Sequence, residues 1–311
     1  MADDKIKIIV VAGPTASGKT SLGIEIARAV NGEIISADSM QVYKGMSIAT
    51  AAPDESEKSA VPHHLVEILS QQESYSVSDF CDMAREKIAD IISKGKTPVI
   101  VGGTGLFIDS LVDNIKFSET KTDYELRNKL MEKSADELYA MLLKIDERAA
   151  LDIHKNNKSR VVRALEIYYT AGKTKSMQNE ASRAEESPYD ALYFVLAYEN
   201  REVLYSRINS RVDLMIENGL VEEARLALEN ENSKTSAQAI GHKELKPYFD
   251  GSLSLDAAVD NLKKETRHYA KRQITWFKRR KNAEIIYMDC AQGNPVDTAV
   301  NKSREFIYGK K

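Results

Sequence analysis

The first third of the chain alternates short apolar runs with glycine-containing loops. Residues 6–12 form a β-branched apolar run that ends at Gly13, and residues 98–101 form another that ends in Gly102-Gly103-Thr104-Gly105. A shorter run at residues 33–36 ends just before Asp38. Apolar runs of this length that stop at glycine are typical of strands buried on both faces of a parallel sheet.

Helical periodicity fills the spaces between these runs. Residues 21–30 and 79–94 carry apolar side chains at three- and four-residue spacing, which predicts an amphipathic helix in each. A strand, a loop and a helix in this order are typical of the opening of a doubly wound sheet. The alternation of strands with helices therefore predicts an α/β fold built on a parallel sheet.

The pattern changes after about Asn114. Residues 124–150 and 159–171 are charged, helical in pattern and without strand character, and residues 174–187 are polar and predicted to form a mobile loop. Strand character returns at residues 192–197. This interruption predicts a small helical domain inserted into the sheet domain.

The insertion defines the expected organisation of the chain. Residues 1–114 and 191–311 would form the two parts of a catalytic sheet domain, and residues 115–190 the helical insertion. Residues 201–280 are again mostly helical in pattern, and a final strand is predicted at residues 284–288.

Composition narrows the class of protein. The chain of 311 residues has a net charge of only −3, so any surface for a polyanion must be local. Cys81 and Cys290 are far apart in the sequence, which disfavours a disulfide framework and a zinc site. The sequence has no apolar targeting segment at its start, and no run approaches the roughly 20 apolar residues of a membrane span. We expect a soluble cytoplasmic protein without membrane association.

A complete phosphate-binding motif follows the first strand. It fits the pattern G-x-x-x-x-G-K-[ST] at Gly13, Pro14, Thr15, Ala16, Ser17, Gly18, Lys19 and Thr20. Backbone N–H groups of such a loop surround a phosphate, and the N-terminus of the next helix adds partial positive charge. Lys19 can neutralise the terminal phosphates, and the Thr20 hydroxyl can ligate Mg²⁺.

The motif indicates binding of a diphosphate more strongly than hydrolysis of ATP. An NTPase should also carry an acidic residue after an apolar strand, but the run at residues 99–101 ends in Gly102. The best acidic residue at a strand end is Asp38, which could bind Mg²⁺ through water, act as a general base or simply cap a helix. The glycines at residues 102–105 suit either the close approach of a ligand or a second chain, or a plain tight turn without a ligand.

Residues 263–282 form a basic segment with nine cations and one acid. The cations are Lys263, Lys264, Arg267, Lys271, Arg272, Lys278, Arg279, Arg280 and Lys281, and the aromatic-ring residues among them are His268, Tyr269, Trp276 and Phe277. Cations that neutralise phosphates and rings that stack on bases suit a single-stranded RNA loop. The alternative is a solvated helix face whose Trp276 and Phe277 pack in the core. In a slightly acidic chain, the cluster favours RNA.

Motifs spread over nearly the whole chain resemble the tRNA dimethylallyltransferase family. They are GPTASGKT at 13–20, ISADSMQVYKGM at 35–46, PHHL at 62–65, PVIVGGTGLFIDSL at 98–111, RVVRALEIY at 160–168, RINSRVDLMIENGLVEEA at 207–224, AIGHKEL at 239–245 and TRHYAKRQITWFKR at 266–279. The resemblance implies transfer of a dimethylallyl group from dimethylallyl diphosphate to N6 of adenosine 37, next to the anticodon, in tRNAs that read codons starting with U. Diphosphate is released. The chain ends soon after Met288 without the zinc module of many eukaryotic members, which favours a bacterial type.

The resemblance also assigns roles to residues around the phosphate loop. It implies that Asp38 is the general base, that Thr104 lies beside the reaction channel and that Lys19 acts in catalysis. Arg211 would help the loop hold the diphosphate, with Mg²⁺ as the cofactor bound through Thr20. Arg207 lies one helical turn before Arg211, where a solvated surface position is the alternative.

The partner implied by the resemblance is the anticodon stem-loop of tRNA, bound by a monomer. The expected contacts are Asp38, Ser39, Met40, Gln41, Thr104, Arg127, Ser159, Arg160, Arg163, His242, Lys243, Lys271 and Arg272. Ser159 and His242 depart from the family pattern, which usually has glutamine or arginine and tyrosine at these positions. For Arg160 and Arg163 the alternative is a surface face paired with Glu166, and His63 and His64 are interpreted as loop or core residues.

Three other functions compete with this one. An adenylate isopentenyltransferase would use the same donor with a free nucleotide as acceptor, but it needs neither the helical insertion nor the basic segment. A small-molecule kinase would bind ATP, and the missing acidic residue after the strand at 98–101 disfavours it. A non-catalytic RNA-binding protein would not need the intact set of Lys19, Thr20 and Asp38.

Overall fold

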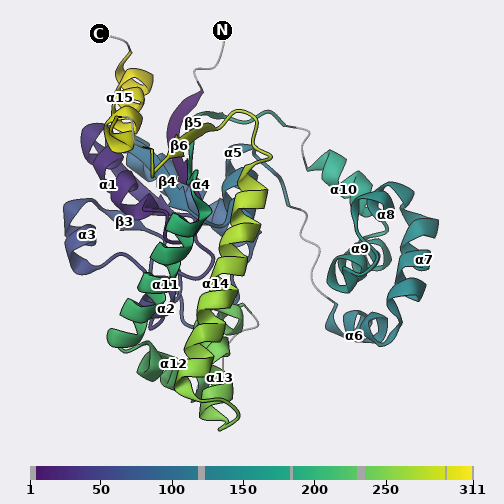
Figure 1. Cartoon of the computed structure of the whole chain (residues 1–311). Coiled ribbons are helices and arrows are strands. Elements are labelled where there is room, and N and C mark those ends of the chain that lie inside the picture. Colours follow the sequence, from purple (N-terminus) through teal and green to yellow (C-terminus); the bar gives the residue numbers. More distant parts are fainter. Residues whose placement is uncertain (1–4, 118–122, 183–184, 230–234, 291–292, 310–311) are drawn as a thin grey trace. The chain divides into compact units, whose positions relative to one another are not determined.

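The computed structural model describes residues 5–117, 123–182, 185–229, 235–290 and 293–309. The chain divides into two compact units, one of Met1–Val112 with Pro188–Lys311 and one of Asp113–Ser187 (Figure 1). The insertion expected at residues 115–190 has boundaries within a few residues of the second unit. Helices in the described ranges lack the combination of length and apolar character that a membrane span requires.

A parallel sheet forms the centre of the first unit. In spatial order its strands are β3 (His63–His64), β2 (Gly32–Ser36), β4 (Thr97–Gly102), β1 (Ile6–Ala12), β5 (Tyr189–Ala197) and β6 (Glu284–Tyr287). Ala12 pairs with Gly102, and Ser36 with Val101. Because these strands end at the same edge, the segments after β1, β2 and β4 meet there. The expected doubly wound α/β fold is confirmed.

The side chains of β1 alternate between two apolar layers. Ile8 and Val10 belong to a core shared with α4 (Val77–Ser93) and α5 (Gly105–Val112). Ile9 and Val11 belong to a second core shared with α1 (Lys19–Ala29) and α15 (Pro295–Tyr308). Burial on both faces explains the continuous apolar runs in the sequence.

A helical layer extends the first unit beyond the carboxyl edge of the sheet. It contains α2 (Ser47–Thr50), α11 (Arg201–Glu217), α12 (Leu220–Glu229), the 3₁₀ turn η1 (Ser236–Gln238), α13 (His242–Phe249) and α14 (Leu255–Phe277). Val212, Leu245 and Leu262 help to form the apolar core of this layer. Helix α3 (Glu55–Ala60) instead precedes β3 and packs Ala60 against the core shared with α1. Helices α11 and α14 lie side by side (Figure 1).

The second unit is a bundle of short helices with its own core. Its helices are α6 (Tyr124–Glu132), α7 (Ala135–Ile145), α8 (Glu147–Asp152), α9 (Lys158–Ala171) and α10 (Lys175–Ala181). Leu138, Leu142 and Leu165 are fully buried between them. The helical character predicted for this segment is confirmed.

Three local predictions are wrong or incomplete. The loop predicted at residues 174–187 contains α10, which begins where the Thr174 hydroxyl accepts a hydrogen bond from Met177 N. Its polar composition has no apolar period that could reveal it, and residues 183–184 of this prediction lie outside the described residues. His63 and His64 form β3, a strand too short for periodicity to detect. The last helix, α15, was not predicted.

Candidate active site

The phosphate loop joins β1 to α1 through backbone conformations that require glycine. Gly18, with φ of 92°, is the N-cap of α1. Gly13 has φ of 153°, and a Cβ there would lie 3.0 Å from the carbonyl oxygen of Leu196. The loop therefore delivers Lys19 and Thr20 to the first turn of a helix, as the motif predicts.

Two distant helices hold the loop in place. From α11, Arg207 Nε donates a hydrogen bond of 2.9 Å to the carbonyl oxygen of Ala16. From α14, Gln273 Oε1 accepts one of 2.8 Å from Thr15 N. Arg207 therefore contacts the loop directly although its side chain stays exposed, so the solvated helix face considered for it is also observed. The loop geometry depends on residues far away in the sequence.

Two cations and one carboxylate meet beside the loop. Lys19 Nζ donates to the Pro14 carbonyl oxygen at 2.6 Å. Burial and the nearby Arg211 guanidinium lower the pKa of Lys19 to about 7, although Asp38 opposes the shift. Burial also lowers the pKa of Arg211, again against the attraction of Asp38. This concentration of positive charge in a confined space favours an anionic ligand.

Asp38 caps a turn rather than a helix. Its Oδ1 accepts hydrogen bonds from Met40 N at 2.9 Å and Gln41 N at 3.4 Å, and residues 39–42 form a turn. The helix-cap alternative is therefore wrong, although the capping chemistry is similar. These bonds fix the carboxylate at the end of β2, where it lines the same cavity as Lys19 and Arg211.

Thr104 connects the end of β4 to the turn that carries Asp38. Its Oγ1 accepts a hydrogen bond of 3.1 Å from Ser39 N, and its own N–H donates to the Ala37 carbonyl oxygen at 3.2 Å. The hydroxyl of Tyr269, from α14, is also hydrogen-bonded to Thr104, and burial raises the pKa of that tyrosine. Thr104 therefore lies within one polar cluster with Asp38 and Tyr269.

The glycines after β4 allow other parts of the protein to approach closely. A Cβ at Gly102 would lie 2.2 Å from the Ala37 carbonyl oxygen, and one at Gly103 would lie 2.3 Å from Gln273 Nε2. Gln273 Nε2 donates to the Gly103 carbonyl oxygen at 2.9 Å. Segments of the same chain therefore pack against these glycines, an explanation that the sequence analysis did not include.

Gln273 is a site residue that the motif comparison did not single out. Its buried amide bridges the phosphate loop at Thr15 and the end of β4 at Gly103. In the sequence, Gln273 is marked only as an uncharged polar residue that follows Lys271 and Arg272 in the basic segment. That signal does not identify its partners.

Ser39, Met40 and Gln41, which are predicted tRNA contacts, differ in how firmly other parts of the protein hold their side chains. Ser39 and Met40 line the cavity beside Asp38. Gln41 lines it too, but Nε2 donates to the carbonyl oxygens of Thr50 and Ala51 at 3.3 and 3.0 Å. Its Oε1 accepts a hydrogen bond of 2.8 Å from Ser36. The amide of Gln41 therefore holds α2 against the end of β2.

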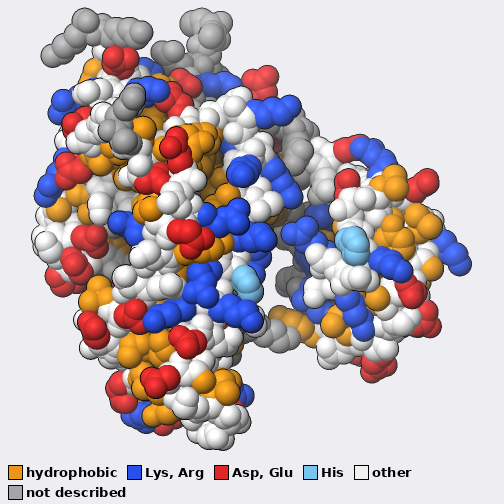
Figure 2. Space-filling model, in the orientation of Figure 1, with side chains coloured by type: hydrophobic (Ala, Val, Ile, Leu, Met, Phe, Trp, Pro, Cys, Tyr) orange, Lys and Arg blue, Asp and Glu red, His pale blue; other side chains and the backbone are white. Residues whose placement is uncertain are grey.

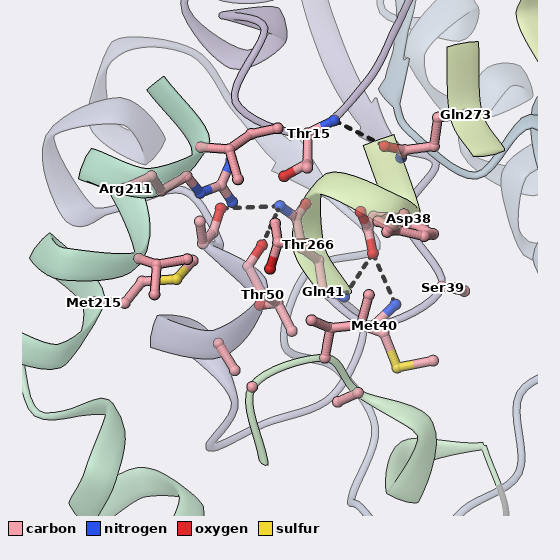
Figure 3. A pocket seen from close by; sticks show the side chains of 18 of the residues that line it. Thr15, Asp38, Ser39, Met40, Gln41, Thr50, Arg211, Met215, Thr266 and Gln273 are labelled. Atoms are coloured by element: carbon pink, nitrogen blue, oxygen red, sulfur yellow. Dashed lines mark hydrogen bonds between the residues drawn. The ribbon is translucent and has the colours of Figure 1, made fainter. Parts of the chain in front are cut away.

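A cavity of about 200 Å³ joins these groups (Figure 3). We call the part beside the phosphate loop and Asp38 its polar end, and the part against the apolar core of the helical layer its apolar end. The polar end is lined by Lys19, Thr20, Asp38 and Arg211, and the apolar end by Ala49, Val212, Met215, Ile240 and Leu262. Figure 3 shows Arg211 and Met215 on one side of the view and Asp38 on the other. The cavity can therefore hold a molecule with an anionic head and a short apolar part.

The polar end suits Mg²⁺ only together with a phosphate ligand. Thr20 and Asp38 line it, and Mg²⁺ is usually held by one or two protein oxygens, waters and substrate phosphates. Within the described ranges, no group of three or more His, Cys, Asp or Glu residues is arranged to hold a metal ion. The donors present therefore fit a metal that arrives with a diphosphate.

The outer face of α14 is strongly basic. Lys and Arg side chains gather over this helix in Figure 2. On this helix Lys271 and Arg272 are exposed, within one helical turn of the cavity-lining Gln273 and Tyr269. Trp276 instead donates from Nε1 to Asp109 Oδ2 at 2.7 Å, and Phe277 is buried. Both rings pack against the core, which is the alternative that the sequence left open for them.

His242 is not available for the contact expected of it. Its side chain is only 6% exposed and forms a hydrogen bond of 2.9 Å with Glu223 Oε1. Because the ring is enclosed at the start of α13, this arrangement does not present it for the tRNA contact expected from the sequence. Lys243, the next residue, has a side chain that is 43% exposed.

The predicted tRNA contacts in the second unit lie on or beside α9. Arg127 and Arg163 pair with the fully buried Glu166 at 2.8 and 2.9 Å, while their side chains stay 35% and 37% exposed. For Arg163, the ion pair with Glu166 that the sequence analysis gave as an alternative is therefore confirmed. Ser159 and Arg160 are exposed at the start of α9. Contact of these four residues with RNA stays a prediction.

Fold and site together define a P-loop α/β protein whose phosphate loop opens into a partly apolar cavity. A family model described as IPP transferase matches residues 41–280, and the chain belongs to this family.

Similar proteins extend over nearly the full chain. The tRNA dimethylallyltransferase of Acetivibrio thermocellus is 47% identical over 288 residues, which cover 91% of this chain and 92% of the relative. That of Bacillus subtilis is 45% identical, with 99% and 98% covered.

Solved structures show the same fold. The tRNA isopentenylpyrophosphate transferase of Bacillus halodurans has a TM-score of 0.71 and 39% identity, with 98% of this chain and 96% of that chain covered. A eukaryotic dimethylallyltransferase described as acting on tRNA has a TM-score of 0.84 and 31% identity, with 98% and 80% covered. The family resemblance seen in the motifs is confirmed.

Proposed function

We propose that this chain transfers a dimethylallyl group from dimethylallyl diphosphate to tRNA. The observation that carries the proposal is the single cavity with a phosphate loop and two cations at one end and apolar side chains at the other. Dimethylallyl diphosphate has the same two parts. The similar proteins named for this activity support the choice of donor and acceptor. The acceptor atom in the proposal is N6 of adenosine 37, in tRNAs that read codons starting with U.

The polar end of the cavity would stabilise the leaving group. As the allylic carbon–oxygen bond breaks, negative charge develops on the diphosphate. Lys19, Arg211 and the loop amides are already in position to neutralise it, and such preorganised stabilisation is typically worth several kcal/mol. Mg²⁺, held by Thr20 with the diphosphate oxygens, would add to that neutralisation when bound. The fixed positions of the loop, through Arg207 and Gln273, keep these groups aligned.

Asp38 would accept the proton that the reaction releases. The adenine amine attacks the allylic carbon, so that a carbon–nitrogen bond forms while the carbon–oxygen bond to diphosphate breaks. The amine proton passes to the Asp38 carboxylate, which the turn amide of Met40 holds in place. General-base catalysis of this kind contributes roughly 10²- to 10⁴-fold. Thr104 fixes the same turn through Ser39.

The acceptor is proposed to be tRNA because the cavity and the basic surface share one helix. Thr266, Tyr269 and Gln273 of α14 line the cavity, whereas Lys271 and Arg272 of the same helix are exposed. A base enclosed in the cavity must leave its stack, which costs about a few kcal/mol. Phosphate contacts along α14 would offset that cost. A free nucleotide needs no such surface. The cytoplasmic location and the monomeric state stay predictions.

The test uses purified protein, Mg²⁺ and radiolabelled dimethylallyl diphosphate with unmodified tRNA and AMP as parallel acceptors. Label in tRNA alone is the expected result. Label in AMP would keep the donor and overturn the acceptor. Consumption of ATP in a matched reaction, with no label in either acceptor, would mean that the phosphate loop serves a kinase.

A further inference from the structure

One long apolar side chain, that of Met215, lines both the cavity and a surface pocket beside it. We infer that Met215 limits the length of the prenyl group that the protein accepts, because its side chain separates the cavity from open space beyond. This inference rests on the proposed function, since it concerns the donor of that reaction.

The direction of the apolar end follows from α11. Arg207, Arg211 and Met215 are spaced four residues apart, so they share one helix face and are each about 6 Å further along the axis. Arg207 contacts the phosphate loop, and Arg211 lines the polar end. Met215 therefore lies about two helical turns from the loop, and Figure 3 shows it on the same helix as Arg211 and away from Asp38.

Beyond Met215 the protein is not packed. A surface pocket of about 520 Å³ adjoins the cavity, and its lining includes Pro53, Lys58 and Leu214. Ala51, Arg211 and Met215 line both spaces. Alanine has too short a side chain to fill such a gap, and Arg211 belongs to the polar end. The thioether of Met215 is therefore the apolar partition between the two spaces.

The wall contributed by α2 is fixed, so it cannot withdraw to admit a longer chain. Glu223 accepts hydrogen bonds from Ile48 N at 2.8 Å and Ala49 N at 2.9 Å. His242 also hydrogen-bonds to Glu223, and a Cβ at Gly241 would lie 3.2 Å from that of Ala49. These contacts explain why His242 is buried. With α2 fixed, Met215 is the long apolar side chain among the residues that line both spaces.

The inference predicts a change of donor preference when the partition is removed. Met215→Ala should connect the cavity to the surface pocket and admit the ten-carbon geranyl group. The ratio of kcat/KM for geranyl diphosphate to that for dimethylallyl diphosphate, with tRNA as acceptor, should rise by about tenfold or more. Binding of the unreactive thiodiphosphate analogues of both donors should shift in the same direction.

Two variants serve as matched controls. Leu214→Ala removes the neighbouring side chain, which lines the surface pocket but not the cavity, and should leave the donor ratio unchanged. Met215→Leu keeps the volume of the partition and should retain the wild-type preference. Thermal melts of all variants report whether they are folded.

The outcomes separate this inference from the proposed function. A rise in the donor ratio and in binding of the geranyl analogue, seen only in Met215→Ala, supports the inference. Transfer of dimethylallyl by the folded Met215→Ala variant with an unchanged donor ratio and unchanged analogue binding would overturn the inference alone. If the wild type transferred dimethylallyl to neither tRNA nor AMP, the proposed function would fail and the inference with it.

Discussion

The two ends of the cavity are built in different ways. At the polar end, hydrogen bonds to the backbone fix the chemistry: Asp38 is held by Met40 N, and the phosphate loop by Arg207 and Gln273. At the apolar end, side chains such as Val212 and Leu262 are held by packing in the core of the helical layer. The polar end determines which reaction can occur, and the apolar end determines which donor fits.

This difference predicts different responses to mutation. Loss of a hydrogen-bonded polar group leaves its partners unsatisfied and misplaces the reacting atoms. It should therefore lower the rate of the chemical step. Loss of an apolar group should affect the choice and affinity of the donor more than the rate of the chemical step.

The largest expected effect is at Asp38. Asp38→Ala should reduce the single-turnover rate of transfer by about 10² to 10⁴-fold, because it removes the proposed general base. Binding of tRNA and of the donor, measured by titration, should persist. Asp38→Asn is the control: it can still accept the bond from Met40 N but cannot take the proton. A rate within a few-fold of wild type in either variant would contradict the role of base.

A smaller effect is expected from Gln273→Leu. The leucine leaves Thr15 N and the Gly103 carbonyl oxygen without their present partner, which typically costs about 1–3 kcal/mol. Since the phosphate loop is then less well positioned, kcat/KM for the donor should fall about tenfold or more, while tRNA affinity stays unchanged. Thr275→Ala, at an exposed position on the same helix, is the control. A lower Tm with unaltered kinetic constants would reduce Gln273 to a purely structural role.

The basic face of α14 should affect RNA binding without affecting donor binding. Lys271→Ala combined with Arg272→Ala should weaken tRNA binding and reduce the magnitude of the slope of log K against log salt by about 1.4 to 1.8. Lys87→Ala with Lys94→Ala, on α4 and at its C-cap, removes the same charge elsewhere. Equal slopes for the α14 variant and the wild type would show that this face does not bind RNA.

The smallest expected effect is the uptake of protons when diphosphate binds beside Lys19. The pKa of Lys19 is lowered to about 7, so the ammonium form predominates below that pH and is lost above it. A bound diphosphate would favour the ammonium form and raise the pKa, so binding above pH 7 should take up protons. Calorimetry of inorganic diphosphate binding in buffers of different ionisation enthalpy measures this uptake. Lys19→Met should show less uptake than wild type, and equal uptake in both would mean that Lys19 does not respond to the ligand.

The sequence predicts the polar end much better than the apolar end. Residues 13–20 form a local motif whose function depends on backbone geometry, so it can be recognised without the rest of the chain. Asp38 and Thr104 lie at strand ends, where a parallel sheet brings them together.

Met215, Ile240 and Gln273 reach the cavity from helices and turns whose packing no local pattern specifies. The error at His242 has the same origin. Nothing in its neighbourhood in the sequence shows that Glu223 encloses it.

The central claim is that one cavity brings a prenyl diphosphate and a tRNA adenosine together. The most direct test is to incubate the protein with Mg²⁺, dimethylallyl diphosphate and a tRNA transcript, and then to identify the nucleosides of the digested RNA by mass spectrometry. A transcript with guanosine in place of adenosine 37 is the control. The proposed function predicts one adenosine heavier by a C₅H₈ unit in the first transcript and none in the control. The same modified nucleoside in both transcripts, or in neither, would contradict the claim.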